Sequence, residues 1–295
     1  MKRFTLALIL LFLTLALSSC RPESAALGST RTRDSDGMVM VYVPAGQFAM
    51  GSTASEVDRA LQQCSDFRVA CIVDQFDDEM PSHLATLAAF WLDGTEVANA
   101  QYHRCVEAGR CTPTSCPEDA AVNGDTQPVV CLSWDQAGAY CAWAGGRLPT
   151  ESEWEYAARG TARLTYPWGN DFDSTRASYC DASCPFSWAD MQSGDGYTQT
   201  APVGSFPTGA SWCGALDMAG NAWEWVQDWY APYTSEPVIN PVAEQGASGR
   251  VLRGGSWDLD PAFLRSAVRN WGEPAASSNV TGFRCVVPIA PQANP

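Results

Sequence analysis

The sequence predicts a loop-rich α+β domain with short strands, few helices and several disulfides. Of its 12 cysteines, Cys20 comes first and the remaining 11 suit an exported, disulfide-bonded chain. Residues 160–230 consist mostly of turn-forming residues and tryptophans with little periodicity. Two clear helix starts precede them. No repeat or interior linker divides the 295 residues, which indicates one domain.

The N-terminus resembles a bacterial lipoprotein signal. Lys2 and Arg3 precede an apolar run over residues 6–17, which is too short to span a bilayer comfortably. Small residues then end at Cys20, where a lipid would anchor the mature chain to a membrane. An ordinary secretory signal with an incidental cysteine is the alternative. Both interpretations export the protein, and the first places it in the bacterial cell envelope, exposed to the periplasm or the exterior.

These signals divide the chain into four parts. We predict a signal peptide over residues 1–19, the lipidated Cys20 and a polar tether over residues 20–37, a domain over residues 38–290 and a tail over residues 291–295. Removing the signal takes away two basic residues and lowers the formal net charge from −15 to −17. A surface this acidic argues against nucleic acid and anionic lipid as partners.

The first half of the domain is expected to alternate short strands with helices. A strand-like run begins at Met38 and turns at Pro44-Ala45-Gly46. A helix over residues 55–63, a strand and turn over residues 84–96, and a helix capped by Asn99 and running to Val106 follow.

The two helix starts in the middle of the chain are capping boxes. Ser133 pairs with Gln136, and Thr150 pairs with Glu153, so that each hydroxyl and each longer side chain satisfies a backbone N–H of the first turn. The first box opens a helix that carries Cys141, and the second opens the helix of the sequence ESEWEYAA.

The cysteines after Cys20 favour five disulfides and one free thiol. Cys64 and Cys71 bracket a loop that a local bridge closes, and Cys180 and Cys184 are spaced for another. Two bridges among Cys105, Cys111, Cys116 and Cys131 are expected, with their pairing left open. A cysteine-rich metal cluster is disfavoured because no C-x-x-C pair occurs.

The segment from residue 253 to residue 285 is expected to close the fold and line its site. Gly254 and Gly255 permit backbone conformations that a Cβ forbids. Arg265, Arg269 and Arg284 each require an acidic or carbonyl partner where they are buried.

Six ordered motifs resemble the formylglycine-generating enzyme, or sulfatase-modifying factor, family. They are MVYVPAG with FAMG (residues 40–51), EMPSH (79–83), GRLPTESEWEYA (146–157), YPWGN (166–170), GNAWEW (220–225), and RGGSW with GFRC (253–257 and 282–285). The resemblance implies the C-type-lectin-like fold of that family, with little regular secondary structure and bound calcium.

The resemblance also places the family's copper site, and this sequence departs from it there. The family's type enzyme oxidises a sulfatase cysteine to formylglycine with oxygen and a copper ion held by two cysteines. The matching positions are Leu259 and Leu264. Leucine offers no thiolate, so copper is not expected. An iron-dependent branch uses several histidines, whereas His83 and His103 are expected to serve in the structure and on the surface.

The resemblance implies calcium as the bound metal, at two sets of positions. The first set comprises Asp217, the carbonyls of Gly220 and Ala222, and Glu224, with ion pairs to arginines as the alternative for the two acids. The second set comprises the following groups: Ser178, the Tyr179 carbonyl, Asp195 and the Tyr197 carbonyl. Ser178 replaces an asparagine and is the weaker donor, and a Cys180–Cys184 bridge is an alternative way to hold this loop.

Two further assignments follow from the resemblance. Cys141 and Cys285 correspond to a family disulfide, and Cys213 then remains as the free thiol. The would-be active groove is lined by Ser256, Trp257, Arg269, Asn270 and Trp271, a set with aromatic faces and polar groups for a peptide, protein or glycan. Core packing is the alternative for each tryptophan alone.

These observations favour a calcium-stabilised binding or accessory module on the cell envelope that has lost the copper oxidase site. The alternative is an oxidoreductase that modifies a cysteine in a protein or peptide with rearranged catalytic residues, for which Cys213 is the candidate thiol. A purely structural lipoprotein is the third hypothesis, and it predicts a filled, apolar groove floor.

Overall fold

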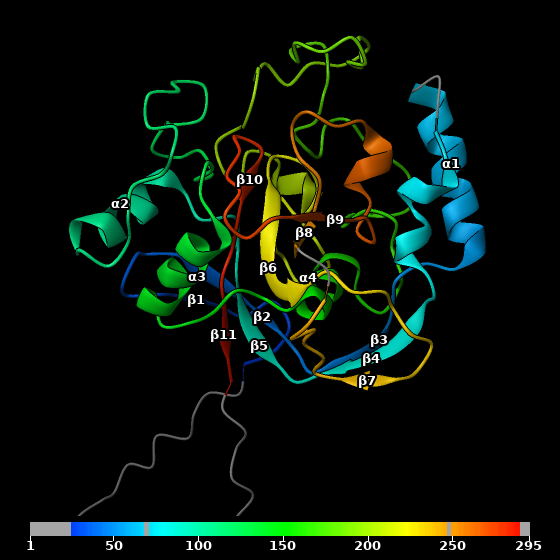
Figure 1. Ribbon diagram of the computed structural model, residues 1–295, viewed down its shortest axis with the longest axis horizontal. Coiled ribbons are helices and arrows are strands. Elements are labelled where there is room, and N and C mark those ends of the chain that lie inside the picture. Colours follow the sequence, from blue (N-terminus) through cyan, green and yellow to red (C-terminus); the bar gives the residue numbers. More distant parts are fainter. Residues whose placement is uncertain (1–24, 68–70, 247–248, 290–295) are drawn as a thin grey trace, which may run out of the picture.

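The computed structural model describes residues 25–67, 71–246 and 249–289, which form three small sheets with helices around them (Figure 1). The predicted signal peptide, Cys20 and the predicted tail (291–295) lie outside the described residues. The strand orders are β1-β2-β5-β11, β10-β6-β8-β9 and β3-β4-β7. The loop-rich α+β fold class is confirmed.

The strands are short. In chain order they are β1 (Thr30–Thr32), β2 (Val39–Val43), β3 (Gly46–Met50), β4 (His83–Leu87), β5 (Phe90–Asp93), β6 (Trp223–Trp229), β7 (Val238–Ile239), β8 (Arg250–Arg253), β9 (Arg269–Gly272), β10 (Thr281–Gly282) and β11 (Val286–Pro288). Most neighbouring strands pair antiparallel, and β10 with β6 and β4 with β7 pair parallel.

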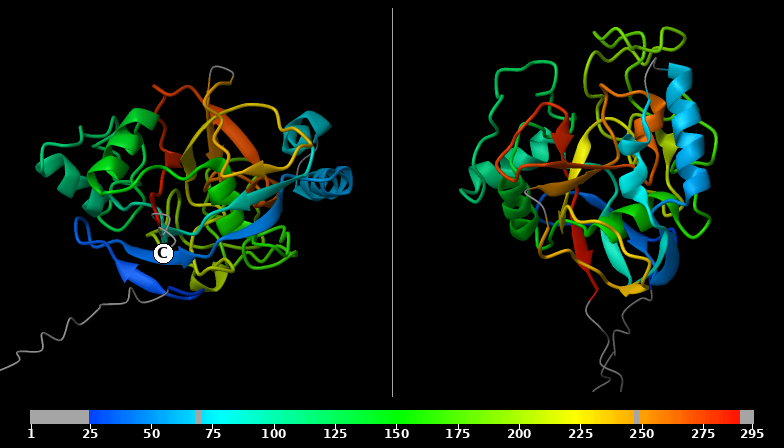
Figure 2. Two further views of the ribbon diagram at one scale, coloured as in Figure 1. Left: turned by 90° about the horizontal axis from the view of Figure 1, so that it is seen from below. Right: turned by 45° about the vertical axis from the view of Figure 1, so that its right-hand side comes forward.

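The α-helices are α1 (Ala54–Phe67), α2 (Asn99–Glu107), α3 (Trp134–Trp143) and α4 (Glu151–Arg159), and the 3-10 turns are η1 (Val73–Gln75), η2 (Asp77–Glu79), η3 (Pro207–Gly209) and η4 (Pro261–Leu264). Helices α2 and α3 lie together on one side of the sheets, and α1 lies on the opposite side (Figures 1 and 2). Among the described residues, no helix is both long enough and apolar enough to cross a membrane.

Both predicted capping boxes are confirmed. The backbone N–H of Gln136 donates to Ser133 Oγ at 3.3 Å, and that of Glu153 donates to Thr150 Oγ1 at 3.1 Å. Asn99, in contrast, does not cap α2. It is the first residue of the helix, and its buried Nδ2 donates to the carbonyls of the loop over residues 122–127.

The predicted boundary of the domain at residue 38 is wrong, because the tether joins the fold before it. Strand β1 pairs with β2, with Thr30 opposite Val41. Arg33 is buried and forms ion pairs with Asp36 and Asp93, each at 2.6 Å. A polar composition therefore hid an ordered segment whose charges pair with one another and with β5.

Helix α4 lies at the centre of the molecule, and all nine of its residues are buried. Its apolar residues, among them the fully buried Trp154, pack against β3, β4, β6 and β8. Its carboxylates Glu151 and Glu155 are one α-helical turn apart and meet the arginines that close the chain.

We call Glu151, Glu155, Arg253 and Arg269 the arginine–carboxylate network. Arg253 Nη2 lies 2.7 Å from Glu155 Oε2, and Arg269 Nε lies 2.7 Å from Glu151 Oε1. All four side chains are buried. Outside this network Arg265 pairs with Glu79, and Arg284 pairs with Glu224, so each terminal arginine has the expected acidic partner.

The described residues contain five disulfides, and these match the predictions. Cys64–Cys71 and Cys180–Cys184 are local, and Cys141 joins α3 to Cys285. The pairing left open by the sequence is Cys105–Cys111 and Cys116–Cys131.

The Cys141–Cys285 bridge should contribute the most to stability, because it closes the longest loop. Replacing both cysteines by serine is expected to lower the free energy of unfolding by about 5 kcal/mol, since 144 residues separate them. The same change at Cys105 and Cys111, which are 6 residues apart, should cost about 2 kcal/mol. Urea unfolding without reductant measures both values, and equal losses would contradict the expectation.

Candidate functional site

A groove of two adjoining cavities runs beside β9. The cavities hold about 430 Å³ and about 380 Å³, and they share Trp223, Leu259, Asn270 and Trp271 in their walls. The first continues toward η1 and η2, and the second continues toward residues 276–281. Trp271 is 49% exposed and offers the face of its indole to a ligand.

The glycine pair at the end of β8 shapes this groove. Gly254 and Gly255 have φ angles of +98° and +76°, which turn the chain into the loop that carries Leu259. A Cβ on Gly255 would lie 2.7 Å from the carbonyl oxygen of Phe263. The close approach places η4, and with it Phe263, at the wall of the first cavity.

Three of the five predicted groove residues line the groove, and two do not. Arg269 lines the first cavity, and Asn270 and Trp271 line both. Ser256 is fully buried, and its hydroxyl donates to Asp258. Trp257 is buried, and its indole N–H donates to the carbonyl of Asn279 at 3.2 Å. Both are therefore wrongly assigned, because the turn at the glycine pair directs them into the protein.

The first cavity is acidic at one end. Asp74, Asp77 and Asp78 line it from η1 and η2, and sequence reasoning missed them because they lie far from β9 along the chain. Their one signal was the acidic run DQFDDE. Burial raises the pKa of Asp78, whose Oδ2 accepts a hydrogen bond from Tyr230 at 2.6 Å. Arg269 offsets these acids only in part: its charge opposes the rise in the pKa of Asp78, but both oxygens of Glu151 already bind its guanidinium.

The two leucines at the predicted copper positions have different surroundings. Leu259 is partly buried and lines both cavities of the groove. Leu264 is fully buried and packs with Tyr166, Tyr179 and Ala219. A hydrocarbon surface thus occupies both positions.

The free thiol and the two histidines lie apart from the groove. Cys213 is buried, contacts the carbonyl of Ala157 at 3.5 Å, and has a pKa raised by burial. His83 is buried, and its ring meets Tyr233 edge-on at 4.9 Å. His103 is exposed on α2. None of the three lines either cavity of the groove.

The first predicted calcium set is partly occupied by protein donors. Both carboxylate oxygens of Glu224 accept hydrogen bonds from the Arg284 guanidinium, each at 2.7 Å, and one of them also accepts the indole N–H of Trp154. Asp217 Oδ2 accepts the N–H of Gly204 at 2.6 Å. The ion-pair alternative therefore describes Glu224, but it does not describe the carboxylate of Asp217.

A buried acid beside this set escaped sequence reasoning. Glu96 is fully buried, and burial together with the charges of Asp217 and Glu224 raises its pKa well above the usual range. Within the described residues, its Oε2 has no hydrogen-bond partner. Glu96, Asp217 and the carbonyls of Gly220 and Ala222 are thus the groups that this set offers to a cation.

The second set suits a hard cation better. Ser178 Oγ and Asp195 Oδ2 are both buried, and neither has a hydrogen-bond partner among the described residues. Burial and the nearby charge of Asp181 raise the pKa of Asp195 to about 6. Tyr179 is buried, Tyr197 is 37% exposed, and the Cys180–Cys184 bridge holds the loop between Ser178 and Asp195.

Carboxylates alone do not complete either set. In the part of the chain that the structure describes, no group of three or more His, Cys, Asp or Glu side chains is arranged to hold a metal ion. Hydroxyl and backbone carbonyl oxygens would have to supply the rest of a calcium shell, as the predicted sets require.

The comparison with protein families agrees with this geometry. The model of the sulfatase-modifying factor enzyme 1-like domain matches residues 24–289. The chain belongs to this family. The match also begins before residue 38, in agreement with the pairing of β1.

Family members of several kinds are similar to this chain. The formylglycine-generating enzyme of Streptomyces coelicolor is 32% identical over 321 residues, with 92% of this chain and 96% of that protein covered. The inactive C-alpha-formylglycine-generating enzyme 2 of Mus musculus is 40% identical over 165 residues, covering 54% and 48%. The structure of PvdO from Pseudomonas aeruginosa is 26% identical, with a TM-score of 0.69 and coverage of 89% and 99%.

Proposed function

We propose that this protein is a membrane-anchored cell-envelope lipoprotein whose sulfatase-modifying factor domain has lost the copper oxidase site and serves as a calcium-stabilised binding or accessory module. The observation that carries the proposal is the pair of leucines, Leu259 and Leu264, at the positions of the copper ligands. Cu(I) prefers soft thiolate ligands, and neither leucine supplies one.

Among the described residues, no other thiol replaces the missing pair. Cys213 is buried with a raised pKa, which disfavours the thiolate that metal binding and oxidation require. The other described cysteines are in disulfides. The similarity to an inactive relative in mouse supports the proposed loss of activity, because a fold can be kept after its catalytic residues are lost.

The groove supports the binding role. Its volume and its exposed Trp271 suit a peptide or a glycan, and its open cavities distinguish it from the filled floor of a purely structural protein. The end lined by Asp74, Asp77 and Asp78 favours ligands without negative charge at that point.

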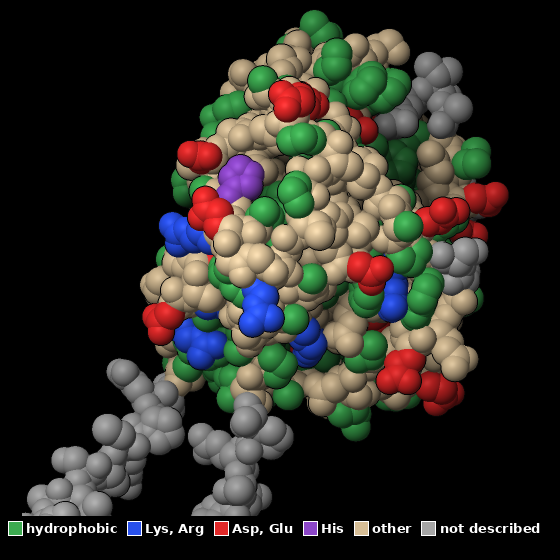
Figure 3. Space-filling view, turned by 60° about the vertical axis from the view of Figure 1, so that its left-hand side comes forward, with side chains coloured by type: hydrophobic (Ala, Val, Ile, Leu, Met, Phe, Trp, Pro, Cys, Tyr) green, Lys and Arg blue, Asp and Glu red, His purple; other side chains and the backbone are tan. Residues whose placement is uncertain are grey.

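The face in Figure 3 shows acidic side chains spread over the surface rather than gathered in one patch.

The first prediction concerns copper. After incubation with Cu(I), the purified protein should retain no stoichiometric copper and should not convert a cysteine-containing sulfatase peptide to formylglycine. The Streptomyces coelicolor enzyme serves as the positive control. Mass spectrometry of the peptide and metal analysis provide the two readouts. Stoichiometric copper together with turnover would refute the proposed loss of function.

A double variant makes the copper experiment sharper. L259C/L264C restores a thiol at each position, whereas L259S/L264S changes the size without supplying a soft ligand. Gain of Cu(I) binding is expected in the cysteine variant alone. Stoichiometric copper in both the wild type and the serine variant would place the copper at another site.

The second prediction concerns the groove. Peptides selected from a random display library on the wild type should bind the W271A variant at least about tenfold more weakly, because the indole supplies an exposed stacking face. The I239A variant is the control, since Ile239 is 75% exposed on β7 and lies outside the groove. If no selected peptide loses affinity for W271A, the groove is not the binding site.

The third prediction concerns calcium at the second set. Calcium should raise the melting temperature of the wild type, and a chelator should reverse the shift, because the ion would bind only the folded chain. The D195N and S178A variants should lose most of this shift, while D34N, a change at an exposed acid, should retain it. A wild type whose melting temperature does not respond to either reagent would exclude the ion here.

A further inference from the structure

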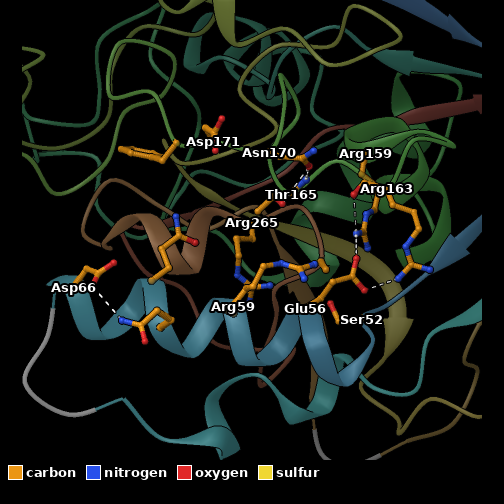
Figure 4. A pocket seen from close by; sticks show the side chains of 15 residues that line it. Ser52, Glu56, Arg59, Asp66, Arg159, Arg163, Thr165, Asn170, Asp171 and Arg265 are labelled. Carbon is orange, nitrogen blue, oxygen red and sulfur yellow. Dashed lines mark hydrogen bonds and ion pairs between the residues drawn. The ribbon is translucent and has the colours of Figure 1, made fainter.

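A polar cavity of about 720 Å³ lies on the side of the molecule that carries α1 (Figure 4). Its walls come from three parts of the chain: residues 52–66, residues 159–172 and the segment after η4. The groove beside β9 shares none of its lining residues. The volume falls within the range of small-molecule sites, about 300 to 1,000 Å³.

One end of this cavity is ionic but internally neutralised. The carboxylate of Glu56 forms ion pairs with Arg163 Nη2 at 2.5 Å and with Arg159 Nη2 at 3.3 Å. Both pairs are marked by dashed lines in Figure 4. Hydrogen bonding to the Thr53 N–H and pairing with Arg163 overcome the effect of burial and lower the pKa of Glu56 to about 2. Arg265 is paired with Glu79 behind the wall. These charges hold the wall together and leave little attraction for an incoming anion.

The groups that remain are a mixture of donors and acceptors. In the described part of the chain, the side chains of Arg59 and Asp171 form no hydrogen bond or ion pair. Gln62 binds only Asp66, at 3.4 Å, and the Nε of Arg159, a residue that is 2% exposed, has no partner there. The free groups therefore comprise one whole guanidinium, carboxylate oxygens, an amide and a buried N–H.

The far wall adds an aromatic surface. Phe172 lines the cavity and packs against Tyr166 at 5.4 Å and Tyr179 at 5.0 Å. Asn170 holds the loop before it by accepting the N–H of Thr165 at 3.1 Å. A ligand in this cavity would thus meet polar groups around it and an aromatic ring at one side.

From this combination we infer that the cavity binds a neutral, polyhydroxylated ligand, of the size of a short oligosaccharide. Each hydroxyl group both donates and accepts, so adjacent hydroxyls match carboxylate, amide and guanidinium groups arranged together. A strongly anionic ligand would meet one free guanidinium, that of Arg59, but also the carboxylates of Asp66 and Asp171, and an apolar ligand would leave the polar walls unpaired. The ring of Phe172 suits the apolar face of a sugar.

The test measures binding of neutral trisaccharides by titration calorimetry. Maltotriose, cellotriose, mannotriose and chitotriose are the probes, and sodium sulfate is the anionic comparison. At least one trisaccharide should bind the wild type, and sulfate should not compete with it. The R59A, Q62A and D171N variants should each weaken that binding at least about tenfold. All three residues are exposed, so the variants are expected to fold.

Two controls separate this site from the groove and from the general effect of removing a charge. R110A removes an exposed arginine after α2 and should leave the affinity within about twofold. W271A alters the groove and should also leave it unchanged. Absence of binding by all four sugars, equal affinity of the cavity variants and the wild type, or displacement by sulfate would each overturn the inference.

Discussion

The structure depends on buried ion pairs between the terminal segment of the chain and the helix at its centre. Glu151 and Glu155 on α4 hold Arg253 and Arg269, and all four residues are buried. Removing one partner of such a pair leaves an uncompensated buried charge and costs about 3 to 5 kcal/mol. Because Arg269 directly precedes Asn270 and Trp271 in β9, the same contacts fix the wall of the groove.

This arrangement uses guanidinium groups throughout. Lys2 is the single lysine of the sequence, so every other basic side chain is an arginine. The planar fork of arginine binds a carboxylate at two points and still donates to backbone carbonyls, as Arg269 does with Glu151, Asp78 and Ala231. A strongly acidic chain can thereby bury its few cations at positions where they connect distant segments.

Sequence reasoning succeeded where a feature depends on local chemistry. The capping boxes at Ser133 and Thr150 and the local disulfides follow from short spacings that leave few alternatives. The family motifs gave the fold and the Cys141–Cys285 bridge. Failures came from long-range contacts. Arg33 looked like part of a tether because its partner Asp93 lies 60 residues away. The acids of the groove and the carboxylate of Glu96 were missed for the same reason.

The polar cavity beside α1 and the groove beside β9 illustrate the same limit. Neither is encoded by a contiguous motif, since each brings together segments that only the folded chain makes adjacent. The two predicted calcium sets also differ in contacts that only the folded chain reveals. Glu224 carries the expected carboxylate, yet Arg284 binds both its oxygens, while the loop of Ser178 and Asp195 keeps two buried oxygens without partners.

The order of strands has a consequence for biosynthesis. The first and last strands of the domain, β1 and β11, belong to one sheet, and Cys285 lies directly before β11. That sheet cannot be completed until nearly the whole chain has been synthesised, and long-range pairing of this kind slows folding. If the chain is exported as proposed, its early segments must cross the membrane before their partners arrive. The protein would then rely on chaperones and on oxidation after translocation.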